Sequence, residues 1–119
     1  MSAQLPDDPQ WKRAHTLLST TNTSADLALI GVPAHLSSIS PTHADQTPDA
    51  IRNALARYST YSTSDNLDLS ANPIADLGNV QSPDGVEGIA RVHGAVKGLL
   101  GKHKLLIALG GDNSITYSV

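Results

Sequence analysis

The residues best suited to chemistry in this chain form a short run, GGDNS, at positions 110–114. The apolar run KLLIAL, residues 104–109, stands directly before it and has the composition of a buried strand. Paired glycines allow positive φ and a close approach of the backbone to a ligand, and a following helix presents free N–H groups. The candidate site therefore consists of Gly110, Gly111, Asp112, Asn113 and Ser114.

Three interpretations of this run remain open on composition. The first is a tight strand-to-helix turn in which Asp112, Asn113 or Ser114 caps the helix. The second is phosphate binding, which the spacing disfavours because neither a P-loop lysine nor the GxGxxG pattern is present. The third is a metal-binding or catalytic loop.

Other chemically able residues lie in the polar segment of residues 34–47. It carries His35 and His43, and it follows a predicted strand, so both histidines are expected on the ligand side of a parallel sheet. A substrate-facing role competes with the simpler interpretation of a solvated loop, and the same holds for Asp45 and Arg52. The remaining histidines, 15, 93 and 103, fall on predicted helices or a helix end, and no Ser-His-Asp triad follows from spacing alone.

These residues need strands and helices to position them. Strands are predicted over 27–32, 74–77 and 104–109, with a further short strand near 67–69. Helices are predicted over 8–19, 48–58 and 83–101, the last two with Thr47-Pro48-Asp49 and Ser82-Pro83-Asp84 as their capped starts. Alternation of strand and helix predicts an α/β fold with a mostly parallel sheet covered by helices.

Bulk properties narrow the class of protein. The 119 residues suffice for one small domain, which we divide into a tail and short helix (1–25) and the strand–helix alternation (26–119). A formal charge of −3 without a basic cluster argues against nucleic acid, and the apolar runs are too short to span a membrane. With no cysteine and no secretory signal, we expect a cytoplasmic protein.

Four pieces of the sequence together resemble the arginase/agmatinase/formiminoglutamase family, the ureohydrolases. They are LALIGVP, TPDAIRNAL, IADLGNV and LLIALGGDNS, in this order over residues 26–119. They are similar to the family's GVP-like strand end, GPxAIR-like helix start, DLGD-like strand end and GGDHS loop. Each piece is weak alone, whereas four in order are specific.

The resemblance implies a three-layer α/β/α fold of which this chain is the amino-terminal part. It implies hydrolysis of a C–N bond in a linear amidine, guanidino or formimino, by hydroxide bridging a pair of manganese ions. The complete protein would act on a small-molecule substrate and form a homo-oligomer. A non-catalytic member that has lost part of its metal site is the alternative.

Two positions depart from the family pattern. Asn113 stands where the GGDHS histidine ligates a metal, so it is either a weakened metal ligand or a simple turn residue. Asn79 stands where the family often has Asp. The family's other metal ligands, from an Asp-x-His-x-Asp strand end and an Asp-x-Asp strand end, do not occur in the sequence, so we expect Val119 to be a fragment boundary.

Overall fold

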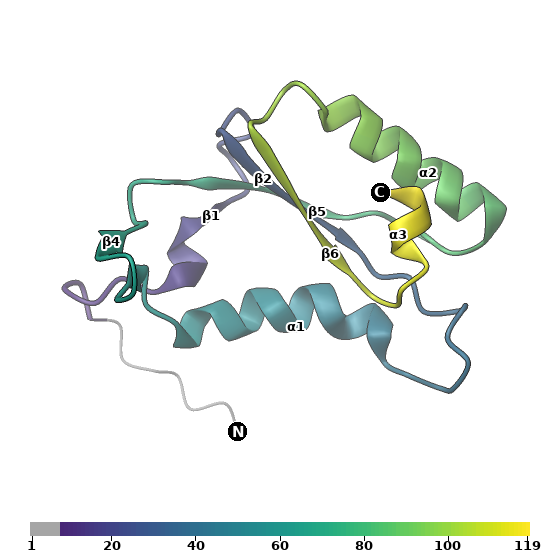
Figure 1. Ribbon diagram of the computed structural model, residues 1–119, viewed down its shortest axis with the longest axis horizontal. Helices are drawn as coiled ribbons and strands as arrows, with labels where there is room; N and C mark the ends of the chain where they lie inside the picture. Colours follow the sequence, from purple (N-terminus) through teal and green to yellow (C-terminus); the bar gives the residue numbers. More distant parts are fainter. Residues whose placement is uncertain (1–7) are drawn as a thin grey trace.

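The computed structural model describes residues 8–119, which form a parallel sheet with helices on both sides (Figure 1). The strands are β1 (Leu18–Ser19), β2 (Leu27–Val32), β3 (Tyr61–Ser62), β4 (Leu67–Asp68), β5 (Ile74–Asn79) and β6 (Leu105–Gly110). The α-helices are α1 (Thr47–Ala54), α2 (Gly85–Leu99) and α3 (Ile115–Ser118). Short 3-10 helices are Ala14–Leu17, Ala44–Gln46 and Leu55–Arg57.

The main sheet has the strand order β1-β5-β2-β6, and every pairing in it is parallel. This confirms the predicted α/β fold with a parallel sheet. Strand β2 lies in the middle and is buried from Ala28 to Val32, as its uninterrupted apolar sequence predicts. Strands β3 and β4 form a separate antiparallel pair, which accounts for the expected strand near residues 67–69.

The helix predicted over residues 8–19 is wrong. Only Ala14–Leu17 form a 3-10 helix, and Leu18–Ser19 then pair with β5 as the edge strand β1. The backbone N–H of Ala14 donates to Tyr58 O, 2.8 Å away, so this segment is positioned by tertiary contacts rather than by helical ones. The expected tail, residues 1–8, lies outside the described residues except for Asp8.

Both predicted helix caps are also wrong. Thr47 lies inside α1, whose cap position is Gln46, and neither α1 nor α2 has a side-chain cap hydrogen bond. Asp84 occupies the cap position of α2, but its carboxylate binds elsewhere. The two helices instead begin where contacts with the strand ends fix them, and tertiary packing replaces the local capping that the sequence suggested.

The core is built from small aliphatic side chains. One cluster joins Val32 and Ala34 to Val92 and Val96 of α2, and a second joins Ala25, Ala28 and Ala75. Val86, Ile89, Val92, Val96 and Leu100 have the helical spacing that predicts a buried stripe on α2, but Val86 and Leu100 stay exposed. The sheet therefore holds α2 by its middle turns.

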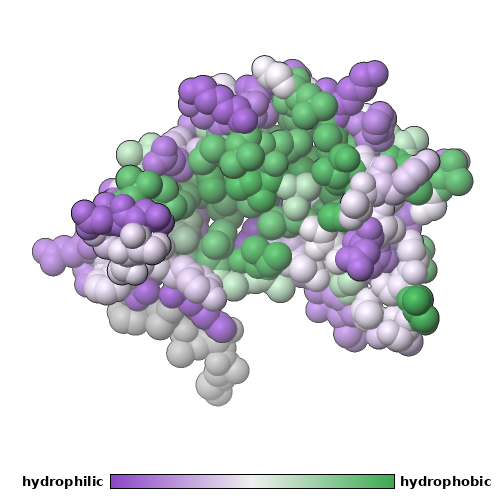
Figure 2. Space-filling model, in the orientation of Figure 1, coloured by the Kyte–Doolittle hydropathy of each residue, from purple (hydrophilic) through white to green (hydrophobic). Residues whose placement is uncertain are grey.

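Strand β6 forms one edge of the sheet. It pairs with β2 along its whole length, and no strand within residues 8–119 covers its other side. Figure 2 shows a continuous apolar area on the face of the molecule where β6 lies in Figure 1. Leu105 of β6 is exposed, so this edge is both open and apolar.

Candidate functional site at the carboxyl edge of the sheet

Three parallel strands end at the same edge and bring distant segments together. Val32 of β2 is in register with Gly110 of β6, and Gly31 is in register with Asn79 of β5. The segment after β2, the start of α2 and the GGDNS turn therefore meet there, as predicted for a parallel sheet.

The two glycines of the GGDNS turn serve close packing rather than positive φ. A Cβ on Gly111 would lie 1.9 Å from Ala34 O, and one on Gly110 would lie 2.2 Å from Ile115 Cδ1. Neither glycine is among the positive-φ residues. The Gly111 N–H donates to Val32 O over 2.9 Å, so the turn is joined directly to the end of β2.

Asp112 is fully engaged in holding this turn. Its Oδ1 accepts hydrogen bonds from the Ser114 hydroxyl and from the Ser114 N–H, the latter at 3.0 Å, and its Oδ2 accepts one from the Ser38 hydroxyl at 3.2 Å. The Ser114 hydroxyl is the main reason that the pKa of Asp112 lies below its ordinary value. Asp112 is thus a charged carboxylate that ties the GGDNS turn to the loop after β2.

Asn113 has the opposite character. Its side chain is exposed and makes no hydrogen bond within residues 8–119, while its carbonyl oxygen accepts the Thr116 N–H at 3.2 Å. Ser114 precedes α3 but makes no cap bond there, since its hydroxyl donates to Asp112. Of the turn's side chains, Asn113 is the one that remains free to meet a ligand.

The two loop histidines separate. The His35 Nδ1 lies 3.5 Å from Asp84 Oδ2, and the His35 N–H donates to Asp84 Oδ1 at 3.0 Å. His43 is exposed and precedes the 3-10 helix Ala44–Gln46. The structure therefore brings His35 to the strand ends and leaves His43 in solvent.

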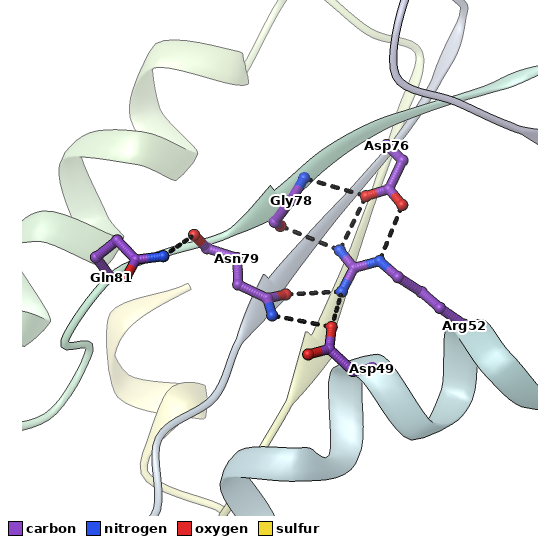
Figure 3. A network of polar contacts seen from close by, with 6 residues as sticks. All are labelled: Asp49, Arg52, Asp76, Gly78, Asn79 and Gln81. Atoms are coloured by element: carbon purple, nitrogen blue, oxygen red, sulfur yellow. Dashed lines mark hydrogen bonds and ion pairs between the residues drawn. The ribbon is translucent and has the colours of Figure 1, made fainter.

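Arg52 of α1 forms a polar network with the end of β5 that the sequence analysis missed (Figure 3). Its Nε and Nη2 donate to the two carboxylate oxygens of Asp76, both at 2.9 Å, and Nη2 also donates to Gly78 O at 3.1 Å. Its Nη1 donates to Asn79 Oδ1 at 2.7 Å and to Asp49 Oδ1 at 3.1 Å. Apart from the bond to Asp49 within α1, the guanidinium's bonds thus fix the carboxyl end of β5 onto α1.

Asn79 has a defined role in this network. Its Nδ2 donates to Asp49 Oδ1 over 3.0 Å, and a Cβ on Gly31 would lie 1.8 Å from its Oδ1. A carboxylate at position 79 would place an acceptor where this amide donates to Asp49. The hydrogen bond from Asn79 to Asp49 is the local reason for an amide at position 79. The sequence signal for this network was the pair of segments AIR and DLGN, which carry Arg52 and Asn79.

The ion pair at the centre of the network is sheltered from water. The side chains of Arg52 and Asp76 are 14% and 11% exposed. Burial alone would raise the pKa of Asp76, but the Arg52 hydrogen bond, the Gly78 N–H and the Arg52 charge outweigh burial and lower that pKa. The carboxylate therefore stays charged.

An open cavity of about 510 Å³ lies beside this network. Its walls come from the loop after β2, from α1, and from the segment between β5 and α2. Its polar lining includes His35, Asp45, Asp49, Asn79 and Asp84. The cavity is thus the concave part of the carboxyl edge.

The residues present do not by themselves fit a manganese centre. Within residues 8–119, no three His, Cys, Asp or Glu side chains lie close enough together to hold a metal ion. The carboxylate of Asp112 is engaged by Ser38 and Ser114, and Asn113 offers one neutral oxygen. Of these two side chains, Asn113 is the one whose oxygen makes no hydrogen bond within residues 8–119.

A parallel sheet between helices, with its polar strand ends gathered at one edge, defines an α/β protein whose site lies at the carboxyl ends of the strands. Residues 25–119 match the Arginase family. The chain therefore belongs to the arginase family, as the four sequence pieces indicated.

Two curated relatives are formimidoylglutamases. The one from Halalkalibacterium halodurans is 39% identical over 93 residues, which are 75% of this chain and 29% of that protein. The one from Bacillus subtilis is 38% identical over 95 residues, which are 76% of this chain and 30% of that protein. The chain thus spans less than a third of the length of these relatives.

Solved structures agree with this assignment. The crystal structure of Bacillus subtilis formimidoylglutamase has a TM-score of 0.83 at 31% identity, covering 98% of this chain and 39% of that one. Agmatine ureohydrolase of Thermoplasma volcanium has a TM-score of 0.77 at 30% identity, covering 90% of this chain and 36% of that one. Trypanosoma cruzi formiminoglutamase with manganese shares the fold, with a TM-score of 0.75 at 24% identity over 87% of this chain and 36% of that one.

Proposed function

We propose that the whole protein to which these residues belong hydrolyses a C–N bond in a linear amidine, with a formimino compound as its substrate. The carrying observation is the 39% identity to a formimidoylglutamase over 93 residues, 75% of this chain. In the reaction, water adds to the amidine carbon and the C–N bond to the amine breaks. N-formimino-L-glutamate would thereby yield formamide and glutamate.

This chain's own residues supply the frame of the site. Arg52 fixes the end of β5, Asp112 fixes the GGDNS turn, and Asp84 fixes the loop after β2. Each of these charged groups is engaged by hydrogen bonds to neighbouring groups of the protein, which supports a positioning role for this part of the protein. The open apolar edge of β6 supports the proposal that the rest of the protein completes the sheet and the site.

Manganese is part of this proposal for the whole protein only. The support is the family and the manganese-containing formiminoglutamase of the same fold. We further propose that Asn113 faces that metal site. Metal, when bound, would activate water for attack on the amidine carbon.

The test is turnover by the whole protein supplied with manganese. N-formimino-L-glutamate, agmatine and arginine are each incubated with it, and formamide, urea and the released amine are quantified. We expect formamide and glutamate in equal amounts from the first substrate. Absence of turnover on all of them would favour the alternative, a non-catalytic member of the family.

No helix within residues 8–119 is both long and apolar enough to cross a membrane. The proposed substrates are small polar molecules, for which an open cavity at the carboxyl edge is a suitable approach. The predicted cytoplasmic location and homo-oligomeric state stay predictions.

A further inference from the structure

The loop after β2 is held at its start by a carboxylate from a distant part of the chain. Asp84 Oδ1 accepts the backbone N–H of His35 at 3.0 Å and that of Leu36 at 2.9 Å. Its Oδ2 lies 3.5 Å from the His35 ring nitrogen Nδ1, and the Asp84 side chain is 10% exposed. One sheltered carboxylate therefore fixes the backbone at the start of this loop and lies beside the imidazole, whose Nδ1 is also 3.4 Å from Pro33 O.

Asp84 occupies the position from which an aspartate side chain usually caps its own helix. It is the cap residue of α2, with the extended backbone that a capping residue adopts, φ −84° and ψ 158°. No side-chain cap bond is made. Both N–H groups that donate to the Asp84 carboxylate belong to His35 and Leu36, far earlier in the sequence, and none belongs to α2. The carboxylate thus links two strand ends and leaves the helix start uncapped.

The segment that carries Asp84 is itself held in an uncommon conformation. Ser82 has φ +46°, a value that non-glycine residues rarely adopt. The Arg91 guanidinium holds it by donating from Nη2 to Ser82 O at 2.7 Å and from Nε to Gln81 O at 3.2 Å. A Cβ on Gly88 would lie 2.3 Å from the Pro83 carbonyl carbon, so the segment also lies directly on the first turns of α2. These contacts direct Asp84 toward the loop.

The loop start and Asp84 together form one wall of the cavity. His35, Leu36 and Asp84 line it together with Asp45, Asp49 and Asn79. Because Asp49 and Asn79 are already fixed by the Arg52 network, the shape of the cavity depends on whether the loop start stays in place.

We propose that Asp84 is a positioning residue: it fixes the loop start, and thereby His35, at the cavity wall where the substrate of the proposed amidine hydrolase binds. This inference rests on the proposed function for its substrate and on geometry for the loop. Asp84 would act through the loop and would not touch the reacting atoms. Its loss should therefore weaken substrate binding more than it slows the chemical step.

The test variant is Asp84→Ser in the whole protein. Serine caps a helix about as well as aspartate, so α2 keeps or gains a cap while the bonds to the loop are lost. Asp84→Asn is the conservative variant, since its amide oxygen can still accept both N–H groups. Glu87→Ala is the matched control, because it removes a carboxylate that is 92% exposed from the same helix end; this carboxylate pairs with the exposed Arg91 over 3.9 Å and makes no contact with the loop.

Two measurements are made on each variant. Amide hydrogen exchange of a peptide containing His35 and Leu36 should be at least tenfold faster in Asp84→Ser and unchanged in Glu87→Ala. With N-formimino-L-glutamate and manganese, the KM of Asp84→Ser should rise about tenfold while kcat changes less than threefold. Asp84→Asn should restore most of both values.

The possible outcomes test the role of Asp84 in holding the loop separately from its effect on substrate binding. Unchanged exchange in Asp84→Ser would overturn the inference even if the protein is active, and so would faster exchange with an unchanged KM. A wild-type protein without turnover on any amidine would refute the proposed function and with it the substrate part of this inference. Faster exchange in that case would still support Asp84 as the residue that holds the loop.

Discussion

Replacing Arg52 with methionine should destabilise the protein strongly. The change keeps most of the side chain's apolar volume but leaves Asp76, whose side chain is 11% exposed, without its partner. Removing one member of a buried, hydrogen-bonded ion pair typically costs about 3–5 kcal/mol, because the remaining charge is left desolvated. We expect a loss of that size in the free energy of unfolding at pH 7.

The control is Asp49→Asn on the other arm of the same network. Asp49 is 66% exposed, and exposed ion pairs contribute about 1 kcal/mol or less. The assay is urea unfolding of the whole protein, followed by circular dichroism. Adding Asp76→Asn to Arg52→Met should recover part of the loss, because it removes the uncompensated charge.

Acidification gives the prediction a second signature. In the wild-type protein the pKa of Asp76 is lowered, so its contribution is complete above the ordinary value of 3.8 and is lost as the pH falls from there through the folded-state pKa. In Arg52→Met, burial without the partner raises the pKa of Asp76, and the carboxyl becomes protonated in the folded state at a higher pH. The stability difference between the two proteins should therefore shrink between pH 7 and pH 4.

A loss below about 1 kcal/mol in Arg52→Met, or a difference that does not change with pH, would refute this reasoning. Either result would mean that Asp76 finds water or another donor once Arg52 is gone.

Three further predictions follow from single positions or from the chain as a whole. Gly31→Ala should lower the free energy of unfolding by about 1–3 kcal/mol, because its Cβ would lie 1.8 Å from Asn79 Oδ1. A Cβ at Gly94 of α2 would meet nothing within 4 Å, so Gly94→Ala should raise that free energy by about 1 kcal/mol. Thermal unfolding of both variants tests the two expectations. Asn113→His should tighten manganese binding to the whole protein at least tenfold, by analogy with the roughly 10–100-fold effects of supporting residues; unchanged affinity in a metal titration would mean that position 113 does not face a metal. The 119 residues alone should show no manganese-dependent hydrolysis of arginine, agmatine or N-formimino-L-glutamate, because the described part has no cluster of metal ligands; measurable turnover would contradict this.

The parallel sheet could be predicted because its signals are local in the sequence. β2 and β6 are short apolar runs bounded by turn residues, and the predicted strand at 74–77 extends in the structure to Asn79. The edge strand β1 could not be found in this way. Leu18–Ser19 become a strand only because β5 pairs with them, and a two-residue segment carries no periodicity of its own.

The helix starts show the same limit. Thr47 and Ser82 have the residue types of caps, yet neither α1 nor α2 is capped by a side chain. Asp84 stands in the cap position of α2, but its carboxylate accepts the backbone N–H groups of His35 and Leu36 and none from the helix. Propensity describes what a residue can do locally, and here long-range donors decided what it does.

The candidate site likewise contains residues that the sequence pattern indicated and residues that it did not. The GGDNS turn was visible because its paired glycines directly follow an apolar run in the sequence, whereas the pairing of Arg52 with Asp76 depends on two elements meeting in space. Once these partners are assigned, Asp76, Asp84 and Asp112 are each committed to a bond that holds the carboxyl edge together. A carboxylate engaged in this way is poorly suited to bind a metal or move a proton, because either task would break the bond that fixes its segment. Asn113 is exposed and makes no such side-chain bond within residues 8–119, so substitutions there should alter ligand binding directly and leave the scaffold intact, whereas substitutions at the three aspartates should act through the segments that these carboxylates hold.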